Sequence, residues 1–433
     1  MQLTEDANAT RSSLVDRIGI YPPLLWGYVG LLLFMIGDGV ESGFLSPYLV
    51  GRGLPEDRVA WIFTVYGAAV ALSSWLSGAL SDLWGPRQVM AVGLLIWATF
   101  EIPFLLFGVI PANYPALLLT YGLRGFGYPL FAFGFLVWIT AATPRKRLGT
   151  SVGWFWFAFT GGLPTLGSLL ASELIPRMGH VQTLWASLAL VVSGGLIALI
   201  GLREPTGMRR LAPPGEKPIS TLLSSISIAW HKPKLAIGCI VRIINTAPQF
   251  GFLVFLPIYF TKVVGFTEDQ WLKMLSAIFL SNIIWNLLFG IIGDRFGWRQ
   301  TVALFGGVGS AITTLLIYYV PQVSNANYPL AVLAGILYGA TLAGYVPLTA
   351  LMPSLAPEHK GAAMSILNLG AGASQWVGPA IVGLFLKPAG VLGVMWIFAV
   401  LYLLSAIMTL FLTLPPDHGT DESRLARTTG EVA

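Results

Sequence analysis

The sequence predicts an all-α integral membrane protein with twelve transmembrane helices, arranged as two six-helix bundles that are related by pseudo-symmetry. Three observations support this fold class. The 433 residues are 55% hydrophobic and only 10% charged, whereas a soluble domain carries about 25% charged residues. Apolar runs long enough to cross a bilayer recur along the whole chain. The two halves of the chain also contain matching segments at a nearly constant offset.

Each predicted helix is an apolar run close to the length of about 20 residues that crosses the hydrocarbon core of a bilayer. Glycine and proline occur inside many of these runs, as is common in membrane helices. The predicted spans are 24–48, 59–80, 88–110, 115–141, 149–172, 183–202, 236–260, 270–292, 301–320, 328–351, 361–385 and 392–413.

Basic residues predict the orientation of these helices, because cytoplasmic loops of membrane proteins carry an excess of Lys and Arg. If both ends of the chain are cytoplasmic, the inside segments include the basic run at 145–147 and the basic loop at 203–234. The net charge of +5 then reflects these loops, so it does not indicate nucleic-acid binding. We therefore predict two cytoplasmic termini.

The loop at 203–234 is the longest segment between spans, and it divides six spans from six. The predicted organisation is an N-terminal bundle (1–202), a cytoplasmic central loop (203–234), a C-terminal bundle (235–414) and a cytoplasmic tail (415–433). The segment GALSDLWGPRQV at 78–89 matches GIIGDRFGWRQT at 290–301, an offset of 212 residues. Such matches between segments of equal rank indicate duplicated halves.

These two matching segments share the pattern G-x-x-x-D-x-x-G-x-R, which follows the second span and recurs after the eighth. Glycine allows a tight turn, Asp can accept hydrogen bonds from a helix N-terminus, and Arg can bridge to a facing helix. We predict that these residues latch a cytoplasmic gate; the alternative is a turn with a solvated charge pair. The predicted gate residues are Gly78, Asp82, Gly85, Arg87, Gly290, Asp294, Arg295, Gly297 and Arg299.

Ionisable residues inside the spans are costly in lipid, and they usually mark functional sites. Asp38 and Glu41 lie three positions apart in the first span and share one face of it, while Arg124 lies in the fourth span and Arg242 in the seventh. We expect the two carboxylates to pair with the two guanidinium groups around a wet cavity. Asp38 or Glu41 is the predicted proton carrier and Arg124 its switch partner; the alternative is a structural ion pair.

Other polar and aromatic residues in the spans are predicted to contact a solute. Arg242, Asn245 and Gln249 form one stripe along the seventh helix. Trp154 can stack on a sugar-like ring or chain, although such residues also form aromatic belts at membrane surfaces. The predicted substrate-binding residues are Arg242, Asn245, Gln249, Tyr128, Asn368, Gln375, Asn282 and Trp154.

The gate pattern resembles the signature loop of the major facilitator superfamily. Several longer segments resemble the bacterial ribitol and D-arabinitol permeases, and this resemblance covers nearly the full chain. These segments include LLWGYVGLLLFMIGDGVESGFLSPYL (24–49), YGLRGFGYPLF (121–131), GWFWFAF (153–159), VRIINTAPQFGF (241–252) and HKGAAMSILNLGAGASQWVGPAI (359–381).

The resemblance implies a fold in which helices one, four, seven and ten line a central cavity. The third helix is peripheral in that fold, so Glu101 is not expected to take part in transport. The resemblance also implies a proton-linked importer of linear sugar alcohols in the bacterial inner membrane. The residues that it places in the cavity are Asp38, Glu41, Arg124, Arg242, Asn245 and Asn368.

The predicted function is import of a D-arabinitol- or ribitol-like solute by proton symport through alternating access. A polyol needs many hydrogen-bond donors and acceptors but no net charge. The alternatives are a carrier for a sugar, an organic acid or a drug, and a transporter-like sensor. We do not expect an enzyme. The expected partners are the solute, protons and the lipid bilayer, with no nucleic acid, no cofactor besides the proton gradient, and a monomeric state.

Overall fold

The computed structural model describes residues 20–144, 148–212, 231–356 and 360–414, and the regular elements within them are all helical. In this part of the chain, ten helices are long and apolar enough to cross a membrane. The basic run 145–147, residues 213–230 of the predicted central loop and the predicted tail 415–433 lie outside the described residues. The prediction of an all-α membrane protein is confirmed.

The N-terminal half contains the first six predicted spans. Its elements are η1 (Pro22–Leu24), α2 (Leu25–Gly39), η2 (Val40–Gly43), α3 (Leu45–Gly51), α4 (Glu56–Trp84), α5 (Pro86–Pro103), η3 (Phe104–Val109), α6 (Tyr114–Arg124), α7 (Gly127–Ala142), α8 (Leu148–Thr160), η5 (Gly161–Leu166), α9 (Gly167–Met178), α10 (His180–Gly201) and η6 (Pro205–Met208). The predicted fifth span corresponds to α8, η5 and α9, which follow one another directly.

The C-terminal half contains the remaining spans. Its elements are α12 (Pro233–Ile258), η7 (Tyr259–Val264), α13 (Glu268–Phe296), α14 (Trp298–Thr301), η8 (Val302–Gly309), α15 (Ser310–Val323), α16 (Tyr328–Leu342), η9 (Ala343–Tyr345), α17 (Leu348–Leu355) and α18 (Lys360–Leu410). The long α18 holds the predicted eleventh and twelfth spans, which Gly390 separates with non-helical angles (φ 66°, ψ −179°). The helices are therefore consistent with twelve spans.

Two predicted spans are interrupted by short breaks near their glycines. The first span changes from α2 to the 3₁₀ segment η2 after Gly39, and the fourth breaks at Gly125, between α6 and α7. Glycine has low helix propensity, and at Gly39 it also permits close packing. A Cβ atom added there would lie 1.6 Å from the backbone oxygen of Leu163. Close helix packing through small residues is typical of membrane proteins.

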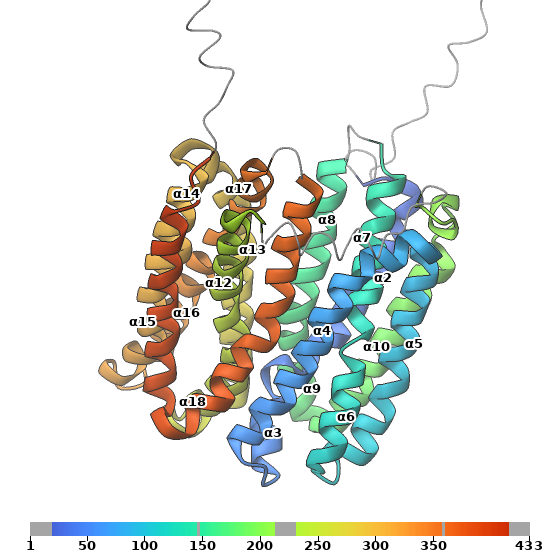
Figure 1. The fold of residues 1–433 in the computed structure, drawn as a ribbon. Helices are drawn as coiled ribbons and strands as arrows, with labels where there is room; N and C mark the ends of the chain where they lie inside the picture. Colours follow the sequence, from blue (N-terminus) through green and yellow to red (C-terminus); the bar gives the residue numbers. More distant parts are fainter. Residues whose placement is uncertain (1–19, 145–147, 213–230, 357–359, 415–433) are drawn as a thin grey trace, which may run out of the picture.

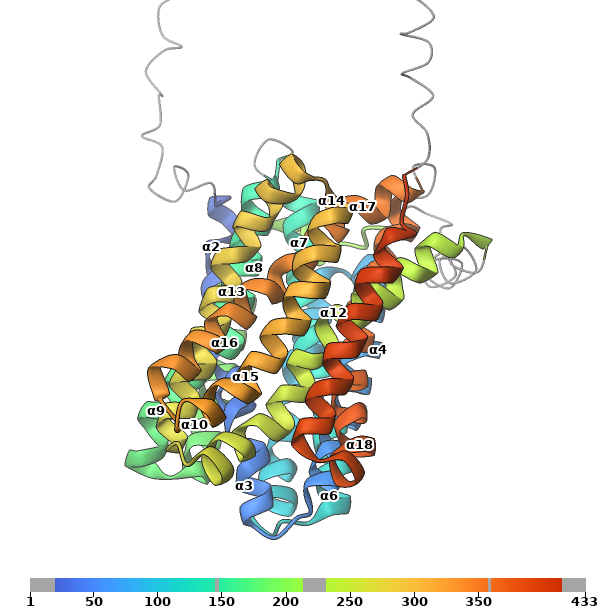
Figure 2. The ribbon, with the colours of Figure 1, turned by 90° about the vertical axis from the view of Figure 1, so that its left-hand side faces the viewer.

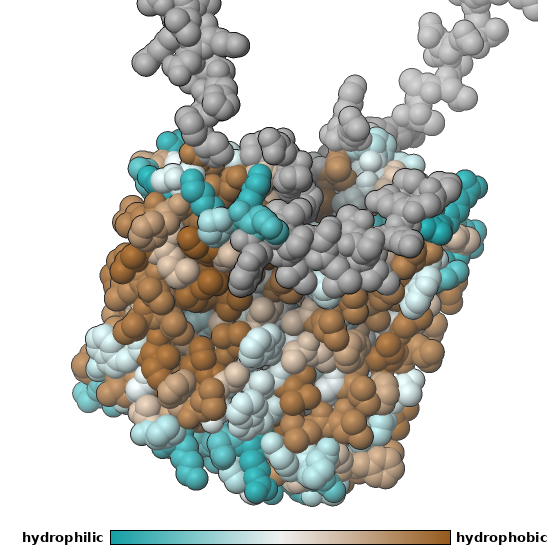
Figure 3. Space-filling view, in the orientation of Figure 1, coloured by the Kyte–Doolittle hydropathy of each residue, from teal (hydrophilic) through white to brown (hydrophobic). Residues whose placement is uncertain are grey.

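The two halves form two bundles that stand side by side (Figure 1). When the C-terminal half faces the viewer, α12 and α18 run along most of the height of the molecule, and α18 turns back at its lower end (Figure 2). The described chain begins and ends at the upper end, which we call the terminal end. Figure 3 shows an apolar band between two more hydrophilic ends, as expected for a protein whose middle lies in lipid.

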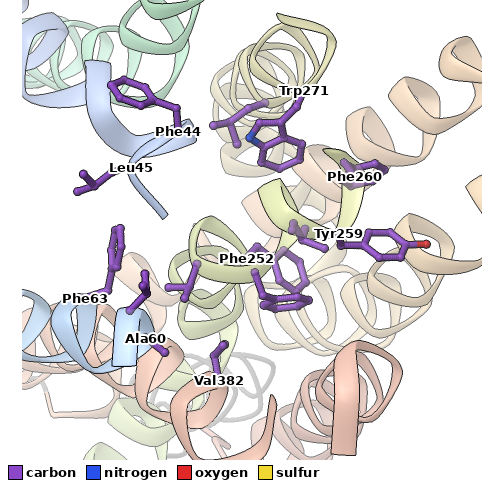
Figure 4. Packing of buried hydrophobic residues seen from close by; sticks show 14 of the residues in the cluster. Phe44, Leu45, Ala60, Phe63, Phe252, Tyr259, Phe260, Trp271 and Val382 are labelled. Carbon is purple, nitrogen blue, oxygen red and sulfur yellow. The ribbon is translucent and has the colours of Figure 1, made fainter. Parts of the chain in front are cut away.

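At the opposite end, which we call the distal end, the two halves are joined. Trp271 Nε1 of α13 donates a hydrogen bond to the backbone oxygen of Gly43 (2.8 Å), and Ser276 Oγ donates to the backbone oxygen of Thr165 (2.9 Å). A single buried apolar cluster contains side chains from both halves, and Figure 4 shows Phe44 and Phe63 of the first half near Trp271 and Phe252 of the second.

The distal contact also includes a hydrogen bond between His180 Nε2 and the Glu268 carboxylate, whose atoms lie 3.0 Å apart. These contacts therefore close the space between the two halves at the distal end. Towards the terminal end, Cβ atoms added at Gly78, Gly153 or Gly290 would meet no atom of the described residues within 4 Å. These glycines face open space on the helices of both halves.

Candidate functional site

A cavity lies between the two halves, and residues from both contribute to its wall. Its empty volume is about 530 Å³, part of which is open to solvent. Phe250, Leu253 and Pro379 supply apolar surface from the C-terminal half. The polar side chains of the wall are Asp38, Glu41, Ser42, Tyr66, Tyr121, Tyr128 and Gln375.

Behind this wall lies Arg124, whose side chain is completely buried at the C-terminal end of α6. Its two terminal nitrogens contact different carboxylates. Nη2 donates to Glu41 Oε1 on η2, and Nη1 donates to Glu101 Oε2 on α5. One guanidinium group is therefore shared between the first and third spans. Four aromatic rings surround the guanidinium carbon, with centroids 4.6–5.6 Å away: Tyr66, Trp97, Phe104 and Tyr121.

The carboxylates receive further hydrogen bonds from these aromatic residues. Trp97 Nε1 donates to Asp38 Oδ1 (2.6 Å), and the hydroxyl of Tyr121 donates to Glu41 Oε1 (2.8 Å). The second carboxylate oxygens of the two glutamates, Glu41 Oε2 and Glu101 Oε1, are buried without a hydrogen-bond partner. Asp38, Glu41, Glu101 and Arg124, which we call the charge cluster, thus hold three carboxyl groups around one guanidinium.

This arrangement differs from the expected pairing of two carboxylates with two guanidinium groups. Glu101, which was not expected to take part in transport, is the second carboxylate that contacts Arg124. The prediction had paired a second carboxylate with Arg242. Arg242 instead stacks on Tyr345, with its guanidinium carbon 3.8 Å from the ring centroid. It forms no ion pair with the described residues. The expectation that the third helix is peripheral was wrong for this side chain, because α5 packs against α6 and turns Glu101 towards Arg124.

A sequence signal for Glu101 did exist. It is a carboxylate in the middle of an apolar span, and such residues usually mark functional sites. Trp97, which binds Asp38, lies four positions earlier and therefore on the same helix face. The aromatic residues Tyr66 and Tyr121 gave no comparable signal, because tyrosine and tryptophan are common in membrane helices.

Two of the predicted substrate-binding residues meet in the cavity. The hydroxyl of Tyr128 on α7 donates to Gln375 Oε1 on α18 (2.9 Å), so this contact joins the two halves. Gln249 lines a smaller neighbouring cavity together with Trp271 and Tyr338.

The other predicted substrate-binding residues lie elsewhere. Asn245 accepts a hydrogen bond from Ser405 Oγ (2.7 Å) within the C-terminal half, and Asn282 Nδ2 donates to the backbone oxygen of Gly339 (3.2 Å). Asn368 is exposed. Trp154 is half-buried and makes an edge contact with Phe157 at 5.4 Å. The structure does not bring these four side chains into the lining of the central cavity.

The predicted gate residues contact their own half in this structure. Gly85 and Gly297 occupy the corresponding turns with φ of 91° and 96°, a conformation that favours glycine. Arg87 Nη2 donates to the backbone oxygen of Leu199 (2.8 Å) and Arg299 Nη1 to that of Leu410 (3.3 Å). Both bonds stay within one half, so neither arginine bridges the two halves through them.

The gate turns also carry other contacts within each half. Asp294 accepts a hydrogen bond from Trp298 Nε1 (2.8 Å), and the backbone oxygen of Asp82 accepts from the amides of Leu211 and Ala212. Gly78 and Gly290 lie one helical turn before these aspartates and face open space. Arg295 is exposed.

The start of the central loop is tied to the N-terminal half through Glu204. Partial burial opposes ionisation of this carboxyl group, but hydrogen bonds from Thr206 and from Trp138 Nε1 (2.6 Å) outweigh that effect. The net result is that the pKa of Glu204 lies below its usual value.

Comparison with known proteins identifies the family of the chain. The sequence profile of the Major Facilitator Superfamily matches residues 27–285 and 239–431. The chain is 45% identical over 421 residues to the alpha-ketoglutarate permease of Bacillus subtilis (strain 168), with 96% of both chains covered. It is 37% identical over 398 residues to the D-arabinitol transporter of Klebsiella pneumoniae, with 91% of this chain and 93% of the relative covered.

A solved structure supports the same fold. It is a bacterial homologue of the human lysosomal transporter Spinster, in an inward-facing and unoccupied conformation. The TM-score is 0.70 at 15% sequence identity, and the match covers 91% of this chain and 98% of that chain. The resemblance noted from the gate loop and the longer segments is thus confirmed, and the chain belongs to the major facilitator superfamily, a family of membrane transporters and not of enzymes.

Proposed function

We propose that this transporter imports a small polyhydroxylated solute, a linear sugar alcohol such as D-arabinitol or ribitol, by proton symport. The observation that carries the proposal is the charge cluster beside the central cavity, in which one buried arginine is shared by two glutamates next to a buried aspartate. Such a cluster can bind and release protons, and it adjoins the space where a solute would lie.

The proton-coupling part of the proposal follows from the charges. Three ionised carboxylates and one guanidinium carry a formal net charge of −2 in a site where Asp38 and Glu41 are 3% and 5% exposed and Glu101 and Arg124 are 0% exposed. Uncompensated charge is costly in a buried site within a membrane. Proton binding lowers this charge, so the cluster can couple its protonation to the state of the transporter. Asp38 and Glu41 are the carboxyl groups that line the cavity.

The solute part of the proposal follows from the cavity wall. The wall offers carboxylates, phenolic hydroxyls and the amide of Gln375, all of which can bond to hydroxyl groups. Arg124 lies behind this wall and is completely buried, so its positive charge is not presented to the solute. An uncharged solute dense in hydroxyl groups fits such a wall, and the similarity to a D-arabinitol transporter supports the same class.

An organic acid is a second candidate solute. Arg242 Nη1 is buried without a hydrogen-bond partner, and the guanidinium group has no carboxylate partner among the described residues. A solute carboxylate would satisfy it. The similarity to an alpha-ketoglutarate permease points to the same class.

We further propose that the terminal end faces the cytoplasm, that the protein lies in the inner (plasma) membrane, and that it acts as a monomer. The excess of basic residues in the segments at the terminal end supports this orientation. The distal end, which contacts between the halves close in this structure, would then face the outside. Rocking of the two halves around the central cavity would expose the site to the other side, with the gate residues meeting at the cytoplasmic end.

The test is uptake into vesicles that contain the purified protein. Labelled D-arabinitol, ribitol and alpha-ketoglutarate are compared, with and without an inward proton gradient. Gradient-stimulated accumulation of a polyol, abolished by a protonophore, is the expected result. Stimulated uptake of alpha-ketoglutarate alone would establish the second candidate. Saturable binding of a polyol without net uptake would indicate a sensor and refute the proposal.

Substitution of the cavity carboxylates tests the proton coupling. We expect Glu41→Gln to abolish gradient-driven accumulation while exchange of labelled for unlabelled solute continues, because exchange needs no net proton movement. Glu173→Gln is the matched control, since Glu173 is an exposed carboxylate paired only with Arg177 (2.9 Å) in the described residues. Unchanged accumulation in both Glu41→Gln and Asp38→Asn would refute the assignment.

A further inference from the structure

We propose that Glu101 is the permanent counter-ion of Arg124, so that Glu41 can exchange a proton with the cavity without leaving the guanidinium group unpaired inside the membrane. The inference rests on the proton coupling proposed above, and it adds to it a positioning residue on the third span. It assigns different roles to two glutamates that contact the same arginine.

Access to the cavity distinguishes the two glutamates. Glu41 is part of the cavity wall, and its side chain is 6% exposed. The Glu101 side chain is 0% exposed and is absent from the wall, as is Arg124. A proton that arrives through water in the cavity can therefore reach Glu41 directly, whereas Glu101 lies behind Arg124.

The hydrogen bonds keep the two contacts independent. Glu101 is held by Nη1 and Glu41 by Nη2, so one contact can break while the other remains. Glu41 Oε2 is buried without a partner and can take up a proton without displacing a donor. Among the described residues, the remaining Nε of Arg124 has no hydrogen-bond partner, and the hydrogen bonds of the guanidinium go to the two glutamates.

Other titratable groups also surround this pair. Asp38 is held by Trp97, and Tyr121 donates to Glu41. The titratable and charged groups that face the cluster are Asp38 from α2, Glu41 from η2, Tyr66 from α4, Glu101 from α5, Tyr121 and Arg124 from α6, and Tyr128 from α7. Arg124 is the one cation in this described set.

The proposed step moves one proton. In the state with both glutamates ionised, Arg124 bridges them. A proton from cavity water then binds to Glu41, its contact with Nη2 weakens, and the guanidinium remains paired with Glu101. After the halves rock, the same O–H bond breaks and the proton passes to water on the other side. Removing the sole partner of a buried charge is strongly unfavourable, and Glu101 prevents that situation.

Glu101→Gln tests this role. Without Glu101, Glu41 would be the remaining carboxylate in direct contact with Arg124, and protonation of Glu41 would leave the guanidinium group without an ionised carboxylate in contact with it. We therefore expect the pH midpoint of gradient-driven uptake to move towards acid by about one to three pH units. Exchange of solute at equal pH should continue. Glu101→Asp, which keeps the negative charge, should return the midpoint towards that of the wild type.

Infrared spectroscopy of the protein in lipid vesicles gives a readout that does not depend on transport. We expect the wild type to show a protonated-carboxyl band that titrates with pH. The band should be absent in Glu41→Gln and should titrate at more acid pH in Glu101→Gln. Glu173→Gln should leave it unchanged. If wild-type uptake does not depend on the proton gradient, the proposed proton symport is refuted. The infrared titrations of the carboxyl band still test the role of Glu101 in that case.

Three outcomes would overturn the inference. A band that persists in Glu41→Gln and disappears in Glu101→Gln would place the exchangeable proton on Glu101. A pH midpoint and a titration that are the same in Glu101→Gln and in the wild type would show that Arg124 does not need this counter-ion. Loss of both uptake and exchange in Glu101→Gln, without recovery in Glu101→Asp, would show a role in folding alone.

Discussion

Trp271 offers a direct test of how the distal end stays closed. Its ring is 1% exposed and lies parallel to Phe260, with ring centroids 5.3 Å apart and an interplanar angle of 17°. Its Nε1 donates the hydrogen bond to the backbone oxygen of Gly43 in the other half (2.8 Å). Trp271→Phe keeps an aromatic ring in this stack and removes the hydrogen bond that joins the halves.

The size of the effect follows from burial of the Gly43 carbonyl group. In the closed state of Trp271→Phe this oxygen lacks its side-chain donor, which costs about 1–3 kcal/mol in a buried site. Once the distal end opens, water can bind the oxygen, so the cost applies to the closed state alone. A free-energy change of about 1–3 kcal/mol shifts an equilibrium by about 5- to 150-fold. Trp271→Phe should therefore raise the fraction of molecules open at the distal end by at least about fivefold.

A cysteine in the cavity wall can report this fraction. Cys239 is the single cysteine of the chain, so Cys239→Ser provides a background without thiols, and Ser42→Cys places one thiol in the cavity wall. A membrane-impermeant maleimide is added on the side of the distal end, and the labelling rate measures how often that end opens. We expect at least about fivefold faster labelling in Trp271→Phe.

The matched control is Trp26→Phe, because Trp26 lies on α2 and is 53% exposed. This change should leave the labelling rate as in the background protein. An equal labelling rate in Trp271→Phe and in the background would refute the reasoning, since it would show that the hydrogen bond to Gly43 does not favour the closed state. Equal acceleration by Trp26→Phe would show a general loosening instead.

Three further predictions follow from other contacts. His180→Asn removes the partly exposed contact with Glu268, so the same assay should show acceleration of no more than about fivefold; a larger effect than that of Trp271→Phe would contradict this ranking. Gly39→Ala forces a Cβ against the Leu163 oxygen and should lower the stability by about 1–3 kcal/mol, which thermal unfolding in detergent would measure; an unchanged unfolding temperature would contradict the packing. Glu204→Gln should be less stable than the wild type near neutral pH, because a lowered pKa stabilises the folded state above the usual pKa of the group. This difference should disappear as the pH falls through the lowered value, and a difference that grows in acid would refute it.

Much of the fold could be predicted from the sequence, because the length and composition of a membrane helix are local properties. An apolar run of sufficient length must form a helix in lipid, where each backbone polar group needs a partner within the segment. The breaks after Gly39 and at Gly125 were less predictable. They depend on how closely neighbouring helices approach, as the contact between Gly39 and Leu163 shows.

The candidate site was only partly predictable. Asp38, Glu41 and Arg124 were predicted as site residues because charges inside spans are rare. The structure places these three side chains together. Asn245 was equally conspicuous as a polar residue in a span, but it bonds to Ser405 within its own half. The polarity of a residue in a span does not indicate which neighbouring helix its side chain contacts.

The residue order is enough to predict that the chain crosses the membrane many times, that its halves are related, and that a few costly charges lie in the spans. Each of these properties depends on composition and spacing along the chain. Only the packed helices show that Arg124 is shared between Glu41 and Glu101 and that Arg242 stacks on Tyr345. The physical reason is that each partner depends on the rotation and packing of helices that are far apart in sequence. Several arrangements could satisfy the same buried charges, and only packing selects one of them.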